Sequence, residues 1–161
     1  MHRVEQFFGH LTAHVRPDEA ALARRILPEG AWPLFDGMPV ADRRHGLDVA
    51  QRLLAAGHDD PDLLVAALLH DAAKGGQLRL WHRVTGVLLE AVAPHLLARL
   101  ASPAPGSRRH AFHVYLHHAA LSAEAARAAG CSERSAAFIR GSAPEADRVL
   151  AAAFHVADEA S

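Results

Sequence analysis

The residues of this 161-residue chain that are best suited to chemistry follow directly after an apolar run. Residues 62–76 read DLLVAALLHDAAKGG, so the pair His70-Asp71 ends the apolar run and Lys74 comes shortly after it. A carboxylate in apolar surroundings is costly unless a cation or hydrogen bonds compensate its charge. Lys74 offers that compensation as an ion pair at a helix end, and a divalent metal offers it with His70 as a second ligand. The segment by itself supports both interpretations equally.

Two further polar residues, His45 and Asp158, fall on helix faces that are otherwise apolar. Each continues a stripe at helical spacing, and the stripe residues are Val49, Leu53 and Ala56 for His45 and Leu150 and Phe154 for Asp158. Side chains on such a stripe face the core of the protein. Two His and two carboxylates that face inward predict a hard-to-borderline metal site, suited to Mn, Fe, Co, Zn or Mg.

The elements that position these residues are expected to be helices. Ala and Leu are abundant and β-branched residues are few, which favours an all-α domain. We expect about eight helices, antiparallel and crossed, in one domain over residues 1–161. The expected helices are 3–15, 17–27, 40–56, 61–74, 77–100 with a break at Pro94, 109–129, 133–140 and 144–160. Segment 28–39 is expected to be a loop with one short turn at 34–36, because it is rich in Pro and Gly.

The composition excludes several classes of protein. With 50 % apolar and 22 % charged residues, the chain is typical of a folded protein. The formal net charge of −1 provides no field that attracts nucleic acid or an anionic membrane. The single Cys, Cys131, excludes a disulfide framework and a Cys-based zinc site. The chain starts without the apolar core of a signal peptide and has no run long enough to span a membrane. We therefore expect a cytoplasmic protein.

The polar residues, taken in order, resemble the signature of a known family. His45, then His70-Asp71, then Asp158 are similar to the H…HD…D pattern of the HD-domain superfamily, and HDAAK resembles the HD-[IV]-[GA]-K form common in bacterial members. The segments ADRRHGLDVAQRLL, ALLHDAAKGGQLRLWHRV, LHHAALSAEAARAAG and IRGSAPEAD look like those of small stand-alone bacterial HD proteins, so the motif core covers residues 41–158. Members of this superfamily are mostly metal-dependent phosphohydrolases with an all-α fold.

The resemblance implies an enzyme that hydrolyses a nucleotide or another small phosphate ester with one divalent metal. The implied ligands of that metal are His45, His70, Asp71 and Asp158. Asp71 would also orient the attacking water, and Lys74 would lie near the metal-bound phosphate. Lys74 is the only Lys among 17 basic residues. A compact ammonium approaches such a phosphate more easily than a planar guanidinium does, which favours this role.

Further site residues also follow from the resemblance. His118 looks like the His of an H-P-x-x-G-A segment that lines the site in related members. Helical spacing favours His118 over its neighbour His117, because Val114, Leu121 and Ala125 continue the stripe of His118. His82 and Arg83, just after the Gly75-Gly76 turn, are candidates for phosphate contacts. Arg44 and Arg140 are weaker candidates for the same role.

The chain departs from the family pattern at two positions. Ser142 stands where related proteins often have a His, which puts a second metal in doubt. Ala72 stands where some nucleotidases have an acidic residue directly after the HD pair. Two alternatives therefore stay open: a non-catalytic module that binds a metal or nucleotide, and a di-iron oxygenase of the HD fold. The expected partner is a small phosphorylated molecule, without nucleic acid or membrane, and both a monomer and a homodimer are compatible with the sequence.

Overall fold

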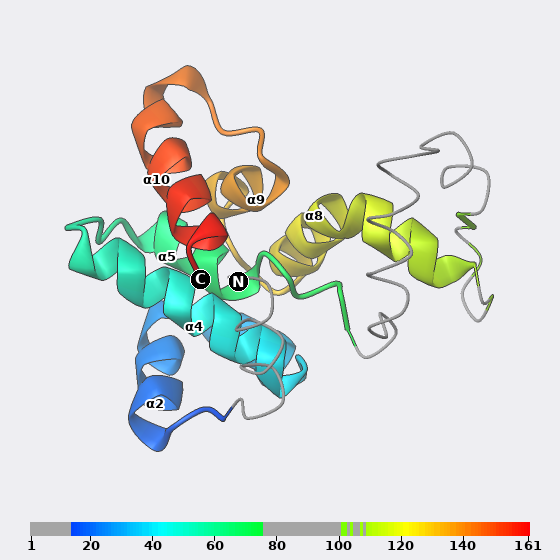
Figure 1. Ribbon diagram of the computed structural model, residues 1–161, viewed down its shortest axis with the longest axis horizontal. Coiled ribbons are helices and arrows are strands. Elements are labelled where there is room, and N and C mark those ends of the chain that lie inside the picture. Colours follow the sequence, from blue (N-terminus) through cyan, green and yellow to red (C-terminus); the bar gives the residue numbers. More distant parts are fainter. Residues whose placement is uncertain (1–13, 76–100, 103, 105–106, 108) are drawn as a thin grey trace.

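The computed structural model describes residues 14–75, 101–102, 104, 107 and 109–161. These residues form seven α-helices and two 3-10 helices without a β-strand, which confirms an all-α fold (Figure 1). The elements are α2 (Pro17–Ile26), η1 (Glu29–Ala31), α3 (Trp32–Asp36), α4 (Val40–Ala55), α5 (Pro61–Leu69), α8 (His110–Ala128), α9 (Glu133–Arg140), η2 (Glu145–Asp147) and α10 (Arg148–Glu159). Within the described part of the chain, none of the helices combines the length and apolar composition needed to cross a bilayer. The expected helices 3–15 and 77–100 lie outside the described residues.

Segment 28–39 was expected to be a loop, and that prediction is wrong. It contains η1 and α3, which follow each other directly. Pro33 occupies the first turn of α3, where the missing N–H of proline costs nothing. Phe35 on the same helix is fully buried in the core. Burial of an aromatic side chain therefore outweighs the Pro and Gly content of the segment.

Helix α5 ends at Leu69 and does not continue to residue 74 as expected. The chain continues in tight turns, with the amide of Ala72 bonded to the carbonyl of Leu69 and the amide of Lys74 bonded to that of Asp71. The amide of Ala73 leaves the helical pattern and donates to Ser122 Oγ on α8, at 3.0 Å. The HD pair and Lys74 are therefore presented by turns at the end of a buried helix. The last helix also begins later than expected, at Arg148, after η2.

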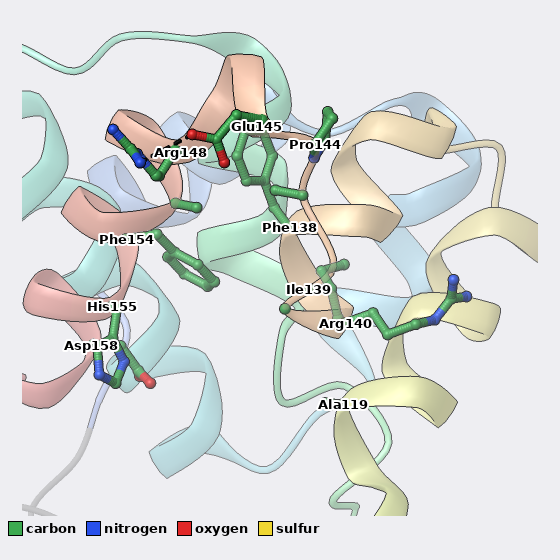
Figure 2. Close-up of a pocket in the computed structure, with 13 residues that line it drawn as sticks. Ala119, Phe138, Ile139, Arg140, Pro144, Glu145, Arg148, Phe154, His155 and Asp158 are labelled. Atoms are coloured by element: carbon green, nitrogen blue, oxygen red, sulfur yellow. Dashed lines mark ion pairs between the residues drawn. The ribbon is translucent and has the colours of Figure 1, made fainter.

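The apolar helix α5 is the centre of the fold. All residues from Leu63 to Leu69 are buried, because α5 contacts α2, α3, α4, α8, α9 and α10. Its N-terminus is fixed by Asp60, whose carboxylate accepts a hydrogen bond from the amide of Leu63 at 3.1 Å. Figure 1 shows α4 across α5, and α8 extending to one side from α9. A pocket lies between α9 and α10 (Figure 2).

Close packing of α4 on α5 depends on Gly46. A Cβ atom at this buried position would lie 3.0 Å from the carbonyl oxygen of Ala67 and 3.1 Å from that of Leu68. Both oxygens belong to the backbone of α5, so neither can rotate away. The absence of a side chain at Gly46 brings the adjacent residue, His45, close to the C-terminal end of α5.

A buried carboxylate, Glu19, ties α2 to α4. Glu19 is 3 % exposed and accepts hydrogen bonds from Arg44 at 2.5 Å, from the amide of Arg16 at 3.0 Å and from Gln51 at 3.3 Å. Burial raises the pKa of Glu19, but these hydrogen bonds and the charge of Arg44 lower it more, to about 2. The carboxylate is therefore ionised in the folded protein at every pH above that value.

The pH dependence of stability is expected to report this pKa. A carboxyl with a lowered folded-state pKa stabilises the protein above its unfolded pKa of 4.5, and this contribution disappears as the pH falls toward 2. We expect Glu19→Gln to lower the free energy of unfolding by about 3 kcal/mol at pH 7 and by much less at pH 2. Urea denaturation at both pH values measures this difference. The control is Asp59→Asn at an exposed position, and a constant difference between wild type and Glu19→Gln would contradict the assignment.

Candidate metal centre

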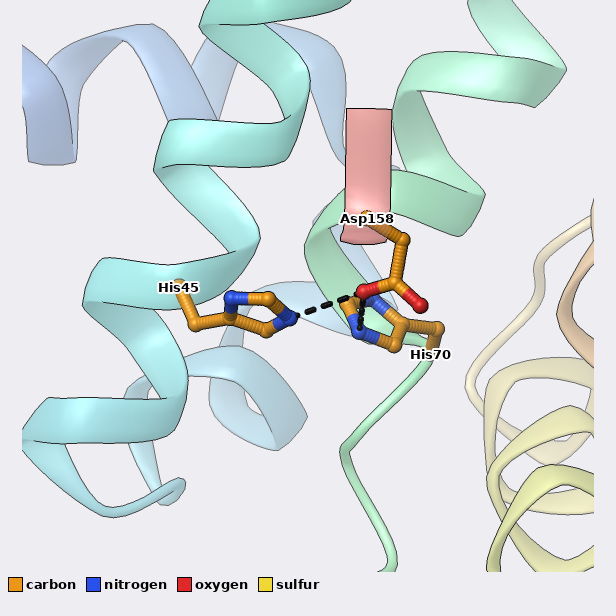
Figure 3. Close-up of side chains that lie close together, drawn as sticks. All are labelled: His45, His70 and Asp158. Atoms are coloured by element: carbon orange, nitrogen blue, oxygen red, sulfur yellow. Dashed lines mark hydrogen bonds and ion pairs between the residues drawn. The ribbon is translucent and has the colours of Figure 1, made fainter. Parts of the chain in front are cut away.

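Three segments that are distant in the sequence place potential metal ligands together. His45 comes from α4, His70 from the C-terminal end of α5 and Asp158 from the last turn of α10 (Figure 3). One ligand atom of each residue lies within 4.8 Å of the others. In the described part of the chain, no other group of three or more His, Cys, Asp or Glu residues meets this condition. These three side chains form a candidate site for a single metal ion and are hereafter called the metal cluster.

The two imidazole rings of the metal cluster point at the same carboxylate oxygen. His45 Nε2 is hydrogen bonded to Asp158 Oδ1 at 2.9 Å, and His70 Nε2 lies 3.2 Å from the same oxygen. The two rings contact each other edge to face, with centroids 5.1 Å apart. Two imidazole nitrogens and one carboxylate oxygen in such a small space are a donor set that Zn, Fe, Mn and Co accept.

The hydrogen bonding of His70 suits it to a ligand role. Its Nδ1 lies 3.0 Å from the carbonyl oxygen of Ala67, a contact in which Nδ1 donates a proton. This contact fixes the tautomer and leaves the lone pair on Nε2, as in most metal-binding His residues. Nε2 is buried, and its 3.2 Å contact with Asp158 Oδ1 is at ion-pair distance without the geometry of a hydrogen bond. A ring nitrogen in this situation takes up either a proton or a metal ion, so the residues present fit a metal ion.

The fourth predicted ligand, Asp71, lies at the edge of the metal cluster. Its Oδ1 is 3.6 Å from His70 Nε2, and Lys74 Nζ lies 2.6 Å from both carboxylate oxygens. Asp71 is 3 % exposed. Burial raises its pKa, but the charges of His70 and Lys74 lower it more, so the carboxyl is ionised. The structure thus contains the Asp71–Lys74 ion pair directly beside the potential metal ligands His45, His70 and Asp158.

The charges at the centre do not balance without a further cation or proton. Asp71 and Asp158 contribute two negative charges, and Lys74 contributes one positive charge. Burial lowers the pKa of His70, but Asp158 and Asp71 raise it more. Burial raises the pKa of Asp158, but His45 and His70 lower it well below its usual range. The centre therefore favours additional positive charge, which either a proton or a divalent cation supplies.

The two adjacent His residues of α8 differ in their surroundings. His118 is half-buried and donates from Nδ1 to the carbonyl of Tyr115 at 2.9 Å. Burial lowers its pKa, and the ring is close enough to Lys74 and Asp71 to respond to both charges. His117 is exposed, and its ring contacts His113 with centroids 4.5 Å apart. The ring of His118 is therefore within electrostatic range of the Asp71–Lys74 pair, whereas that of His117 is exposed and contacts His113.

The other candidate residues are not gathered at the centre. His82 and Arg83 lie outside the described residues. Arg44 is bonded to Glu19 and to Asp48, at 2.5 and 2.8 Å, so its guanidinium is occupied within the fold. Ser142 is exposed in the segment that follows α9. None of these observations adds a ligand to the metal cluster.

A pocket that the sequence did not indicate adjoins the metal cluster. Its volume is about 400 Å³, and Asp158 contributes to its wall (Figure 2). The remaining wall comes from α9, the following segment, α10 and Ala119 of α8. Phe154 is shared between the two sites, because its ring contacts His70 edge to face at 5.7 Å. Phe154 and Asp158 lie on one stripe of α10, which is the single sequence signal that connects the pocket to the cluster.

No protein-family model, curated protein or solved structure matches this chain. The functional assignment therefore rests on the residues and geometry of the metal centre and on the order of its residues in the sequence.

Proposed function

We propose that the chain is a metal-dependent phosphohydrolase that acts on a nucleotide or another small phosphate ester. The observation that carries the proposal is the convergence of His45, His70 and Asp158, with the buried Asp71–Lys74 pair at its edge. One divalent transition metal, Mn, Fe, Co or Zn, is the proposed cofactor, and Mg is an alternative. The order H…HD…D, with Lys74 after the pair, supports an HD-domain assignment.

The residues of the centre have distinct roles in the proposed reaction. A bound divalent cation supplies Lewis-acid chemistry, which lowers the pKa of water and draws charge from a phosphate oxygen. Asp71 is held ionised by Lys74 and accepts a proton from the attacking water. The water oxygen bonds to phosphorus and the ester P–O bond breaks; the leaving oxygen takes a proton from solvent, and Asp71 returns its proton to solvent. Lys74, 24 % exposed, stabilises the charge of the phosphate oxygens.

One observation favours a second candidate function, a non-catalytic module that binds a metal or nucleotide. Lys74 Nζ contacts both oxygens of Asp71, so this carboxylate has to release the ammonium before it accepts a proton. A module that only binds its ligand needs no such step. Both candidates would bind a metal through the same residues. Only a measurement of catalytic turnover separates them.

The proposed function is tested by phosphate release. Protein loaded with Mn²⁺ or Co²⁺ is expected to hydrolyse at least one member of a panel of nucleoside mono-, di- and triphosphates, and a chelator should remove the activity. Absence of hydrolysis by metal-replete protein would favour the binding module. Two bound irons with an oxygen-dependent reaction would replace both candidates by the oxygenase.

Asp71→Ala is expected to bind metal poorly and to lose hydrolysis by at least about 100-fold, since the variant lacks the proposed general base. The matched control is Asp59→Ala, because Asp59 is an exposed carboxylate outside the centre. Metal analysis and phosphate release are measured on both variants. Wild-type metal content in Asp71→Ala would refute Asp71 as a ligand, and wild-type hydrolysis would refute it as the base.

A further inference from the structure

The pocket beside the metal cluster has an apolar interior. Ala151 and Phe154 of α10, both partly exposed, form one wall, and Phe138 and Ile139 of α9, which are 2 % and 4 % exposed, lie behind the other. Ala143, in the segment between the helices, also lines it. Figure 2 shows the rings of Phe138 and Phe154 between the two helices, with Asp158 at one end of the pocket. A ligand that extends from Asp158 into the pocket therefore passes from a charged region to one lined mainly by apolar side chains.

The charged groups of the pocket wall are occupied or turned away. Arg148 forms an ion pair with Glu145 at 2.9 Å, and His155 lies 3.3 Å from Glu159. Arg140 is exposed, and Figure 2 shows its side chain extended toward α8. Apart from Asp158, the charged side chains of the described wall are thus at its exposed rim. The part of a ligand held here is expected to be uncharged.

The size and walls of the pocket favour one flat ring system. A volume of about 400 Å³ is at the lower end of the range for small-molecule sites. Aromatic side chains bind planar rings by offset stacking or edge contacts. A sugar or polyol would bury hydroxyl groups against Phe, Ile and Ala side chains without hydrogen-bond partners, which is costly.

We propose that this pocket is a leaving-group subsite that holds the planar aromatic ring of a phosphate ester while its phosphate lies at the metal cluster. The inference rests on the proposed phosphohydrolase function and specifies its substrate class. The ring has two chemical sources, the base of a nucleotide and the aryl group of an aryl phosphate. Sugar phosphates and polyol phosphates lack the ring and are excluded as good substrates.

Saturation-transfer NMR on the metal-free protein tests the subsite without turnover. The probes are adenosine, p-nitrophenol and ribose, none of which carries a phosphate. We expect transfer to the ring protons of at least one aromatic probe and none to ribose. Stronger transfer to adenosine identifies a nucleotide ligand, and stronger transfer to p-nitrophenol identifies an aryl ester.

Two substitutions that fill the pocket complete the test. Ala151→Leu on α10 and Ala143→Leu in the preceding segment should each weaken ring binding roughly tenfold or more, because the added atoms occupy the space of the ring. The matched control is Ala152→Leu, at an exposed position of α10 outside the pocket wall. Circular dichroism verifies the fold, and the two filling variants lie in different elements, so one remains informative if the other fails to fold.

The outcomes separate this inference from the proposed function. Equal transfer to ribose, no transfer to either ring, or full ring binding in a folded filling variant would overturn the subsite. Ring binding that the filling variants abolish supports it, even in a protein that releases no phosphate. Phosphate release from ribose 5-phosphate at the rate of adenosine 5′-monophosphate and phenyl phosphate would overturn the ring preference and leave the phosphohydrolase intact.

Discussion

Asp158→Ala should bind Mn²⁺ at least about 100-fold more weakly than the wild-type protein, a loss larger than that of an outer-shell partner. The carboxylate is the group at which both imidazole rings point, at 2.9 and 3.2 Å, so its removal leaves two His nitrogens without the third ligand. Phosphate release should fall with metal occupancy. Calorimetric titration with Mn²⁺ and metal analysis of the purified variant measure the effect.

Thermal stability provides a second readout of the same ligand. A metal that binds only the folded state stabilises it, by about 2.7 kcal/mol at 100 times the dissociation constant. Mn²⁺ should therefore raise the melting temperature of the wild type and leave that of Asp158→Ala unchanged. The matched control is Glu159→Ala, because Glu159 is the next residue of α10 and its carboxylate is exposed. Equal Mn²⁺ affinity in wild type and Asp158→Ala would exclude Asp158 from the site.

The faces of the ligand-bearing helices could be predicted from the sequence. Val49 and Leu53, which share the stripe of His45, are buried, and Phe154, which shares that of Asp158, packs against the core. Ala56, the third residue of the His45 stripe, follows the end of α4 and is exposed, so the prediction is wrong there. Helical spacing contains this information because burial of one face repeats along the chain. The distance between His45 and Asp158 was not predictable in this way. It depends on how α4 and α10 cross α5, and no local pattern encodes that crossing.

The C-terminal end of α5, next to His70 and Asp71, is a second feature that local sequence patterns did not predict. The Gly75-Gly76 pair suggested a helix end, yet α5 ends at Leu69. The amide of Ala73 bonds to Ser122, which is 49 positions away in the sequence. Tertiary contacts of this kind override local helix propensity. The pocket between α9 and α10 was missed for the same reason, since its walls come from separate elements.

Gly46→Val should destabilise the protein by about 3 kcal/mol or more, the upper range of overpacking in a core. The added side chain would begin 3.0 Å from the carbonyl oxygen of Ala67 and 3.3 Å from Leu68 Cα, and these backbone atoms belong to the buried part of α5. Gly46→Ala is expected to cost less, because a gain in helix propensity of about 1 kcal/mol opposes the overlap. Urea denaturation of the two variants measures both values.

The same substitution should also weaken metal binding, because Gly46 sets the separation of α4 and α5 next to His45. Displacing α4 moves His45 Nε2 away from His70 and from Asp158 Oδ1, with which it forms a 2.9 Å hydrogen bond. The control is Ala55→Val, which introduces the same β-branched side chain at an exposed position of α4. A folded Gly46→Val protein that binds Mn²⁺ as tightly as wild type would show that the helix separation does not determine the geometry of the metal cluster.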